Sequence, residues 1–172
     1  MDKKIGFIGG GNMASAIIGG ILNSGLASPK QILASDKSDN ALRSLEERFG
    51  IHTTSQNLET AQEADILFLA VKPHLFSEVI PEIKDSIETN ALIVSIAAGQ
   101  SISSIESLFG REIRLIRVMP NTPALVGEGM SALCPNQNVS QEELEEAVSI
   151  FNSFGACEVV SETMIDTVVG VS

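Results

Sequence analysis

The sequence contains no tryptophan or tyrosine, only two cysteines and few basic side chains. Cys134 and Cys157 form no CxxC pair and have no histidine cluster beside them, so we expect neither a metal site nor a disulfide framework. Free thiols in a reducing, cytoplasmic compartment fit this pattern best. No apolar run reaches the roughly 18 residues of a membrane-spanning helix. Three glycines interrupt the apolar stretch after Ile8, and we therefore expect no signal peptide.

Positive charge is scarce and unevenly placed. The chain has 11 basic and 22 acidic side chains, for a formal net charge of −11. Arg117 is the last basic residue, and eight acidic residues follow it, from Glu128 to Asp166. Nucleic-acid binding draws most of its affinity from cations set against phosphates, so this charge argues against a nucleic-acid partner. Any anion site should lie in the first two thirds of the chain.

The 172 residues, 44% of them hydrophobic, suffice for one folded domain. Short apolar runs predict strands, and most lead into stretches with helical periodicity. Their residues are apolar consecutively rather than alternately, as in strands buried on both faces of a parallel sheet. The strands are expected at 5–8, 32–35, 66–71, 92–96, 113–118 and 156–160, with helices at 12–24, 39–49, from 101, and 140–154. The fold class is therefore α/β, a Rossmann-like, doubly wound and mostly parallel sheet.

Two helix starts carry the spacing of a capping box, in which a hydroxyl and a carboxylate three residues apart satisfy each other's backbone N–H groups. These pairs are Ser103 with Glu106, and Ser140 with Glu143.

A glycine-rich turn follows the first predicted strand and opens the first helix. Gly9-Gly10-Gly11-Asn12-Met13-Ala14 matches G-x-G-x-x-A. In this motif the first glycine permits the tight turn, the second lets the backbone approach a pyrophosphate, and the small third residue lets helix and strand pack closely. The phosphates would then bind the free N–H groups of the helix N-terminus. A purely structural turn is the alternative, but the flanking strand and helix favour nucleotide binding.

Other strand ends should face the same crevice, because ligands bind outside the carboxyl ends of parallel strands. Asp36 follows the second strand and would accept hydrogen bonds from a ribose 2′-hydroxyl, whereas Lys37 and Ser38 could hold a 2′-phosphate; a solvated turn is the third interpretation. Lys72 could lie near phosphate or a substrate carboxylate, or simply on the surface. His74 is expected to be a cap or surface histidine rather than an acid or base.

A proline-flanked segment, Arg117-Val-Met-Pro-Asn-Thr-Pro-Ala124, ends the fifth strand. The two prolines stiffen the backbone around Asn121 and Thr122, which would fix the direction of an amide and a hydroxyl. The segment could equally serve only to end the strand.

The motifs FIGGGNMASAI, ADILFLAVKPH, SIAAGQSISSIE, RVMPNTPALVGEGMSA and IDTVVGVS together resemble the pyrroline-5-carboxylate reductase family. The resemblance covers the whole chain. It implies reduction of the C=N bond of L-Δ1-pyrroline-5-carboxylate to L-proline by NADPH or NADH, the last step of proline biosynthesis. A protonated cyclic imine is already an electrophile, so the protein must chiefly position the two reactants.

The resemblance also implies the site. Residues expected to bind the cofactor are Ile8, Gly9, Gly10, Gly11, Asn12, Met13, Asp36, Lys37, Asn57, Ala70, Val71, Lys72, Pro73, Ile96, Ala97 and Ala98. Asn57 would contact the adenine side, and Asn121 and Thr122 would position nicotinamide and substrate. No metal is expected.

In this family the chain continues into a helical domain that forms the dimer and contacts the substrate. We therefore expect residues 1–160 to form the NAD(P)-binding domain, residues 161–172 to begin the connection, and catalytic residues to lie beyond Ser172. The helical domain would be absent from this chain, and the chain by itself would be a poor catalyst. The complete protein would be a cytoplasmic homodimer or larger homo-oligomer. Two alternatives are a non-catalytic nucleotide-binding module and another β-hydroxyacid or imine dehydrogenase with the same N-terminal fold.

Overall fold

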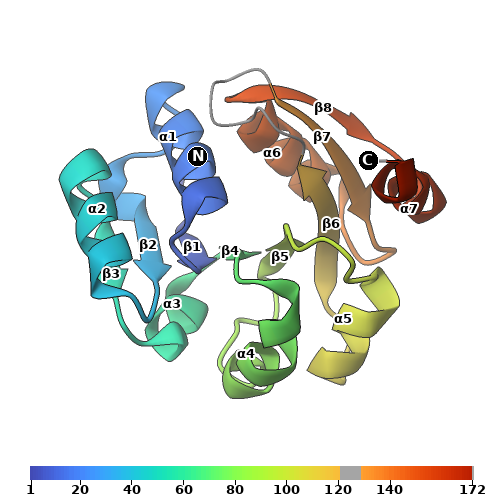
Figure 1. Cartoon of the computed structure of the whole chain (residues 1–172), viewed down its shortest axis with the longest axis horizontal. Helices are drawn as coiled ribbons and strands as arrows, with labels where there is room; N and C mark the ends of the chain where they lie inside the picture. Colours follow the sequence, from blue (N-terminus) through green and yellow to red (C-terminus); the bar gives the residue numbers. More distant parts are fainter. Residues whose placement is uncertain (121–128, 172) are drawn as a thin grey trace.

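The computed structural model describes residues 1–120 and 129–171, with side chains up to Asp166. Eight strands form one sheet in the order β3-β2-β1-β4-β5-β6-β7-β8 (Figure 1). The strands are β1 (Ile5–Ile8), β2 (Ile32–Ser35), β3 (His52–Thr54), β4 (Ile66–Leu69), β5 (Leu92–Ser95), β6 (Arg114–Pro120), β7 (Gly129–Pro135) and β8 (Gly155–Val159). The helices are α1 (Asn12–Asn23), α2 (Asp39–Phe49), α3 (Asn57–Glu63), α4 (Phe76–Ile83), α5 (Ile102–Phe109), α6 (Gln141–Asn152) and α7 (Glu162–Val171), with 3₁₀ turns η1 (Pro29–Gln31) and η2 (Pro73–Leu75).

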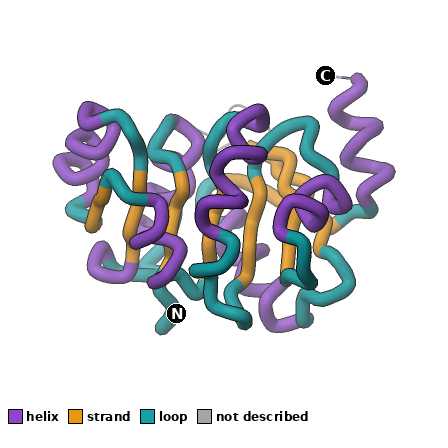
Figure 2. Tube along the Cα trace, turned by 90° about the horizontal axis from the view of Figure 1, so that it is seen from below, coloured by secondary structure: helices purple, strands orange, loops and turns teal. Residues whose placement is uncertain are grey.

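The predicted parallel sheet is confirmed. In the sheet order from β3 to β6, every pair of neighbouring strands is parallel, so both neighbours of β1 run in its direction. The chain runs outward from β1 to β3 and then continues with β4 on the other side of β1, so the strand order reverses between β1 and β4. The far end departs from this pattern, because β7 pairs antiparallel with β6 and parallel with β8. Figure 2 shows the strands in one row, with α7 at the end of the row. At a reversal of strand order, the loops after adjacent strands diverge and leave a crevice.

Helices cover both faces of the sheet, which explains why its strands are apolar at consecutive positions. On one face Phe7, Phe68 and Phe151 pack together, and the rings of Phe7 and Phe68 stack with centroids 4.6 Å apart. On the other face Ile8, Leu69 and Ile93 pack against α4 and α5. The core is therefore a pair of apolar layers separated by the sheet.

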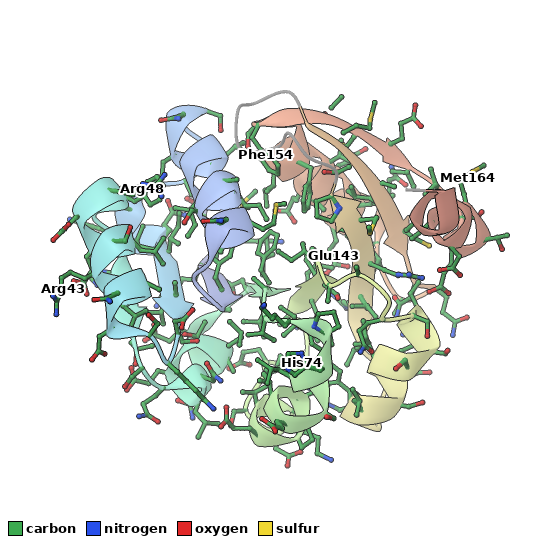
Figure 3. The ribbon with its side chains drawn as sticks, in the orientation of Figure 1. Arg43, Arg48, His74, Glu143, Phe154 and Met164 are labelled. Carbon is green, nitrogen blue, oxygen red and sulfur yellow. The ribbon has the colours of Figure 1, made fainter. Side chains whose placement is uncertain are left out.

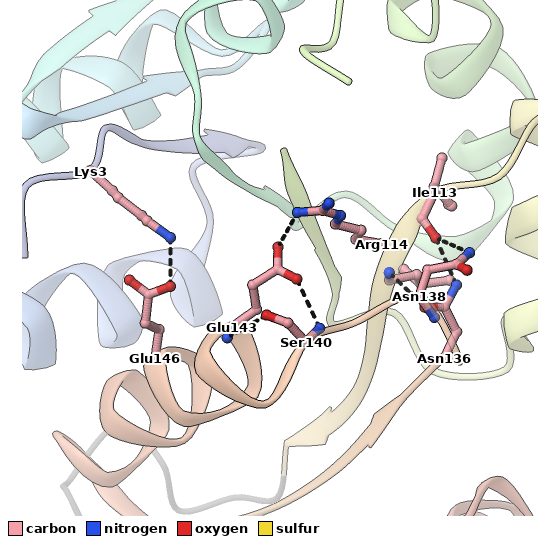
Figure 4. A network of polar contacts seen from close by, with 9 residues as sticks. Lys3, Ile113, Arg114, Asn136, Asn138, Ser140, Glu143 and Glu146 are labelled. Carbon is pink, nitrogen blue, oxygen red and sulfur yellow. Dashed lines mark hydrogen bonds and ion pairs between the residues drawn. The ribbon is translucent and has the colours of Figure 1, made fainter. Parts of the chain in front are cut away.

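Helix α6 is fixed to the sheet by charged and polar contacts (Figure 4). Glu143, which is buried, accepts a hydrogen bond from the Ser140 N–H at 2.9 Å and one from Arg114 of β6 at 3.2 Å. Lys3 contacts Glu146 of the same helix at 2.6 Å. In the same network, Asn136 and Asn138 both donate to the carbonyl of Ile113, the residue before β6. The capping box predicted at Ser140 and Glu143 is present.

Several predicted boundaries need correction. The box predicted at Ser103 and Glu106 is wrong, because Ser101 is the N-cap of α5 and accepts from the Ser104 N–H. Strand β4 ends at Leu69 rather than residue 71, and α6 ends at Asn152 rather than residue 154. The chain turns earlier in both places than apolar character alone indicates. The proposed domain boundary at residue 160 stays a prediction.

Candidate nucleotide site

The glycine turn lies at the switch point of the sheet, between the carboxyl ends of β1, β2 and β4. The Gly9 N–H donates to the Ser35 carbonyl at 2.8 Å, and the Ala70 N–H donates to the Ile8 carbonyl at 2.8 Å. These bonds hold the segments after three strands side by side. The sequence signal for this arrangement is that the glycine turn, Asp36 and Lys72 lie at the ends of predicted strands.

Gly9 and Gly11 have different reasons to be glycine. Gly9 has φ +104°, and a Cβ there would lie 2.6 Å from the Ala70 carbonyl oxygen. Gly11 is the N-cap of α1 with φ −82°, and a Cβ there would have no described atom within 4 Å. The turn therefore requires Gly9, whereas the space beside Gly11 opens to solvent and could admit a ligand close to the backbone.

The N-terminus of α1 suits an anion. Among the described residues, no side chain caps it by a hydrogen bond, and its first turn carries no acidic residue. The first N–H groups of a helix have no intrahelical acceptor, and the helix dipole places partial positive charge there. The glycine turn and this helix end together fit a pyrophosphate.

A cavity of about 310 Å³ adjoins the turn. Its lining brings together residues from four segments that are far apart in the sequence: Gly9, Gly10, Gly11, Ser35, Asp36, Lys37, Asn57, Ala70, Val71, Lys72, Leu75, Glu78 and Val79. Nine of the expected cofactor residues are in this lining. Its walls combine two carboxylates, Asp36 and Glu78, with two ammonium groups, Lys37 and Lys72.

Asp36, the first residue after β2, stabilises the glycine turn by hydrogen bonds. Its Oδ2 accepts from the Gly10 N–H at 2.8 Å, and its Oδ1 accepts from the Ser38 N–H at 2.8 Å. The carboxylate is thereby held at the edge of the cavity beside the glycine turn. Such a fixed acceptor suits a ribose hydroxyl donor.

The other expected residues flank the cavity. Ile8 is buried in the core at the end of β1, and Asn12 and Met13 form the first turn of α1. Pro73 begins η2, and its carbonyl accepts from Gln100 at 3.1 Å, which ties the loop after β5 to the loop after β4. In the β5 loop, Ala97 is buried and Ala98 exposed, and the Ile96 N–H donates to the Leu69 carbonyl at 3.3 Å.

Six residues of functional interest need separate mention. Asn121 and Thr122 lie outside the described residues. His74 is exposed on the 3₁₀ turn that leads into α4 (Figure 3). Leu75 at the end of η2 and Glu78 and Val79 of α4 also line the cavity, and they were missed because the apolar pattern predicted no helix at this place in the sequence.

The pKa of each thiol is raised above its ordinary value. Burial raises the pKa of the Cys134 thiol, and the nearby Glu162 carboxylate raises it further. Burial also raises the pKa of the Cys157 thiol. Because the thiolate is the nucleophile, a raised pKa lowers reactivity at neutral pH. Within residues 1–120 and 129–171, no group of three or more His, Cys, Asp or Glu side chains is placed to hold a metal ion.

A larger cavity, of about 480 Å³, lies at the opposite edge of the sheet. It is lined by the amino ends of β1, β2 and β3, including Lys4, Ile32 and His52. Ligands of open α/β sheets bind at the carboxyl ends of strands, so we assign the nucleotide to the smaller cavity at the glycine turn.

None of the helices in the described part of the chain is both long and apolar enough to cross a membrane.

Comparisons with known proteins point the same way. Residues 4–99, more than half of the chain, match the family model described as NADP oxidoreductase coenzyme F420-dependent. The chain is 45% identical over 172 residues to the pyrroline-5-carboxylate reductase of Escherichia coli (strain K12), covering 100% of this chain and 64% of that protein. It thus spans about 64% of the length of this curated relative.

Solved structures are also similar to this chain. A pyrroline-5-carboxylate reductase from Coxiella burnetii superposes with a TM-score of 0.95 at 37% identity, covering 100% of this chain and 64% of that one. A Plasmodium falciparum pyrroline carboxylate reductase with NADP bound has a TM-score of 0.87 at 33% identity, covering 99% and 62%. A prephenate dehydrogenase from Aquifex aeolicus, at 14% identity and a TM-score of 0.81, shares the fold alone.

Proposed function

We propose that this chain, which belongs to the family described as NADP oxidoreductase coenzyme F420-dependent, is the dinucleotide-binding part of a pyrroline-5-carboxylate reductase. The observation that carries the proposal is the glycine turn at the switch point, with an uncapped α1 N-terminus and open space beside Gly11. The identity of 45% to the Escherichia coli reductase supports the choice of reaction.

The residues that would hold NAD(P)H divide by their chemistry. The N–H groups of Gly11, Asn12 and Met13 would bind the pyrophosphate, and Asp36 the adenosine ribose. The loop after β4, from Ala70 to Pro73, would border the rest of the dinucleotide. When bound, NAD(P)H supplies the hydride that adds to the imine carbon, while the ring nitrogen keeps the proton it carries as an iminium. This chain's task is therefore to hold one reactant in a fixed place.

The substrate side of the reaction is also part of the proposal. Asn121 and Thr122 would position nicotinamide and substrate, and further substrate contacts would come from the part of the reductase that this chain does not span. We propose a cytoplasmic homo-oligomer as the complete enzyme. Free thiols at Cys134 and Cys157 support a reducing compartment.

Titration of the purified chain with NADPH and with NADH, followed by nicotinamide fluorescence, tests the proposal. We expect saturable binding of at least one dinucleotide. A sample that is folded by circular dichroism and binds neither would overturn the assignment. Substrate profiling of the complete reductase then separates pyrroline-5-carboxylate from the substrates of other dehydrogenases that share this fold.

A further inference from the structure

The side-chain amide of Asn57 connects two parts of the nucleotide site. Asn57 is the first residue of α3 and lines the cavity beside Asp36. The Ser35 hydroxyl donates to Asn57 Oδ1 at 2.8 Å, and Asn57 Nδ2 donates to Glu82 Oε1 of α4 at 3.0 Å. The amide is thus held between the end of β2 and the surface of α4.

Glu82 decides which way this amide is turned. A carboxylate only accepts hydrogen bonds, so the amide must present its NH₂ group to Glu82. A hydroxyl can donate or accept, and Ser35 therefore tolerates either orientation of the amide. With these two bonds made, one N–H and one oxygen lone pair of Asn57 stay free for a ligand. The carboxylates of Asp36 and Glu78, which line the same cavity, only accept hydrogen bonds, so neither can donate one to a ligand.

We propose that Glu82, supported by Ser35, is a positioning residue that fixes the Asn57 amide so that its remaining N–H recognises an acceptor nitrogen of the adenine ring. The proposal rests on the dinucleotide function proposed above. The adenine end belongs on this wall because Asp36, the expected ribose partner, lines the same cavity and directly follows Ser35, the hydrogen-bond partner of Asn57. Glu82 itself contacts no ligand and acts only through Asn57.

Glu82→Lys gives a test in which orientation and charge predict opposite results. A lysine ammonium group only donates hydrogen bonds, so this substitution would turn the Asn57 amide until its Oδ1 faces position 82. The free N–H and the free lone pair of Asn57 would then exchange places. A simple charge effect would instead tighten binding of an anionic dinucleotide. Glu82 is exposed, and the substitution should leave the fold intact. Glu88→Lys is the matched control, because Glu88 is exposed and lines a different cavity, at the amino edge of the sheet.

The dissociation constants of NADH and ADP-ribose are measured for the 172-residue chain and its variants. We expect Glu82→Lys to raise both dissociation constants about tenfold relative to Glu88→Lys, because the adenine ring loses one hydrogen bond and meets a mispaired amide. Glu82→Gln retains an acceptor oxygen and should stay within about twofold of the original chain. Reduced nicotinamide mononucleotide, which lacks adenine, should be unaffected. Equal or tighter binding by Glu82→Lys would overturn the proposal.

A second readout does not need a ligand. The side-chain ¹⁵N–¹H signals of Asn57 should shift in Glu82→Lys and stay in place in Glu82→Gln and Glu88→Lys. Unshifted signals in Glu82→Lys would also overturn the positioning role. If the original chain binds no dinucleotide, the proposed function fails, while these signals still decide whether Glu82 orients the amide.

Discussion

Two glycines of one turn, two residues apart, meet different physical demands. Gly9 combines a positive φ with a backbone oxygen where a side chain would begin, so both conformation and space exclude other residues. Gly11 has an ordinary φ and open space around it. The fold requires the first glycine, whereas the open space beside the second suits a ligand that approaches the backbone.

Replacing each glycine by alanine should separate folding from binding. Gly11→Ala should lower the free energy of unfolding by less than about 1 kcal/mol, because the one effect expected on folding is that alanine is a less favourable N-cap than glycine. It should weaken dinucleotide binding at least about tenfold, because a methyl group would enter the phosphate space. Urea unfolding and fluorescence titration measure the two effects.

Gly9→Ala is the counterpart. It should lower the free energy of unfolding by about 2 kcal/mol or more, because alanine would be strained at positive φ and would collide with Ala70. If Gly11→Ala binds dinucleotide as tightly as the original chain, the pyrophosphate does not lie beside Gly11.

At the scale of elements, α7 is held by a buried cation. The Arg117 side chain on β6 is only 4% exposed, and its Nη1 contacts Glu162 at 2.9 Å and Asp166 at 3.0 Å, both on α7. Glu162 Oε2 also accepts from the Ile102 N–H, at the first residue of α5. Residues four apart share a helix face, so α7 presents both carboxylates to one guanidinium. Met164 projects outward from the same helix (Figure 3).

Removing the two carboxylates of this ion cluster should lower the free energy of unfolding more than removing its guanidinium. Joint replacement by Glu162→Gln and Asp166→Asn leaves a buried guanidinium without a countercharge, and should cost about 3 kcal/mol of unfolding free energy. Arg117→Met leaves no buried charge, because the side chains of Glu162 and Asp166 are 33% and 62% exposed and can be hydrated. It should cost about 1 to 2 kcal/mol.

Urea unfolding of the two variants makes this comparison, with Glu158→Gln, an exposed residue of β8, as the charge control. If Arg117→Met lowers the free energy of unfolding more than the joint Glu162→Gln and Asp166→Asn replacement does, the interpretation of a buried cation paired with partly hydrated carboxylates is wrong.

At the scale of the whole molecule, the dinucleotide site joins segments from separate βα units. The glycine turn, the loop after β2, the start of α3 and the loop after β4 all line the cavity. A ligand that contacts all of them adds contacts between these units. Any ligand that binds only the folded chain must stabilise that chain by mass action.

Dinucleotide binding should therefore raise the melting temperature. At a concentration of about 100 times Kd, the gain is about 2.7 kcal/mol. For a chain of this size, each kcal/mol raises Tm by about 2 to 4 °C, so we expect an increase of about 5 to 10 °C. Calorimetry with the bound dinucleotide measures it, and Gly11→Ala at the same concentration serves as the control. An unchanged Tm at saturating dinucleotide would argue against binding to the folded chain.

Much of the architecture could be predicted from local patterns. β1, β2 and α2 have the predicted bounds, because consecutive apolar residues and caps such as Gly50, with φ +68°, act within a few residues of chain. β3 and β7 were missed. The residues of β3 are His-Thr-Thr, exposed or partly buried at an outer position of the sheet, and carry no apolar run. The antiparallel pairing of β7 with β6 is a contact between two strands, and no local pattern within either strand encodes it.

The sequence by itself determined the glycine turn, the alternation of strands and helices, and the strand ends where a nucleotide would lie, because these follow from backbone conformation and burial within single segments. Only the tertiary structure decided which side chains meet. Asn57 and Glu82 are 25 residues apart, and Arg117 and Glu162 are 45 apart. Such pairs form where the packing of helices on a twisted sheet brings distant segments into contact, and the orientation of the Asn57 amide is one result.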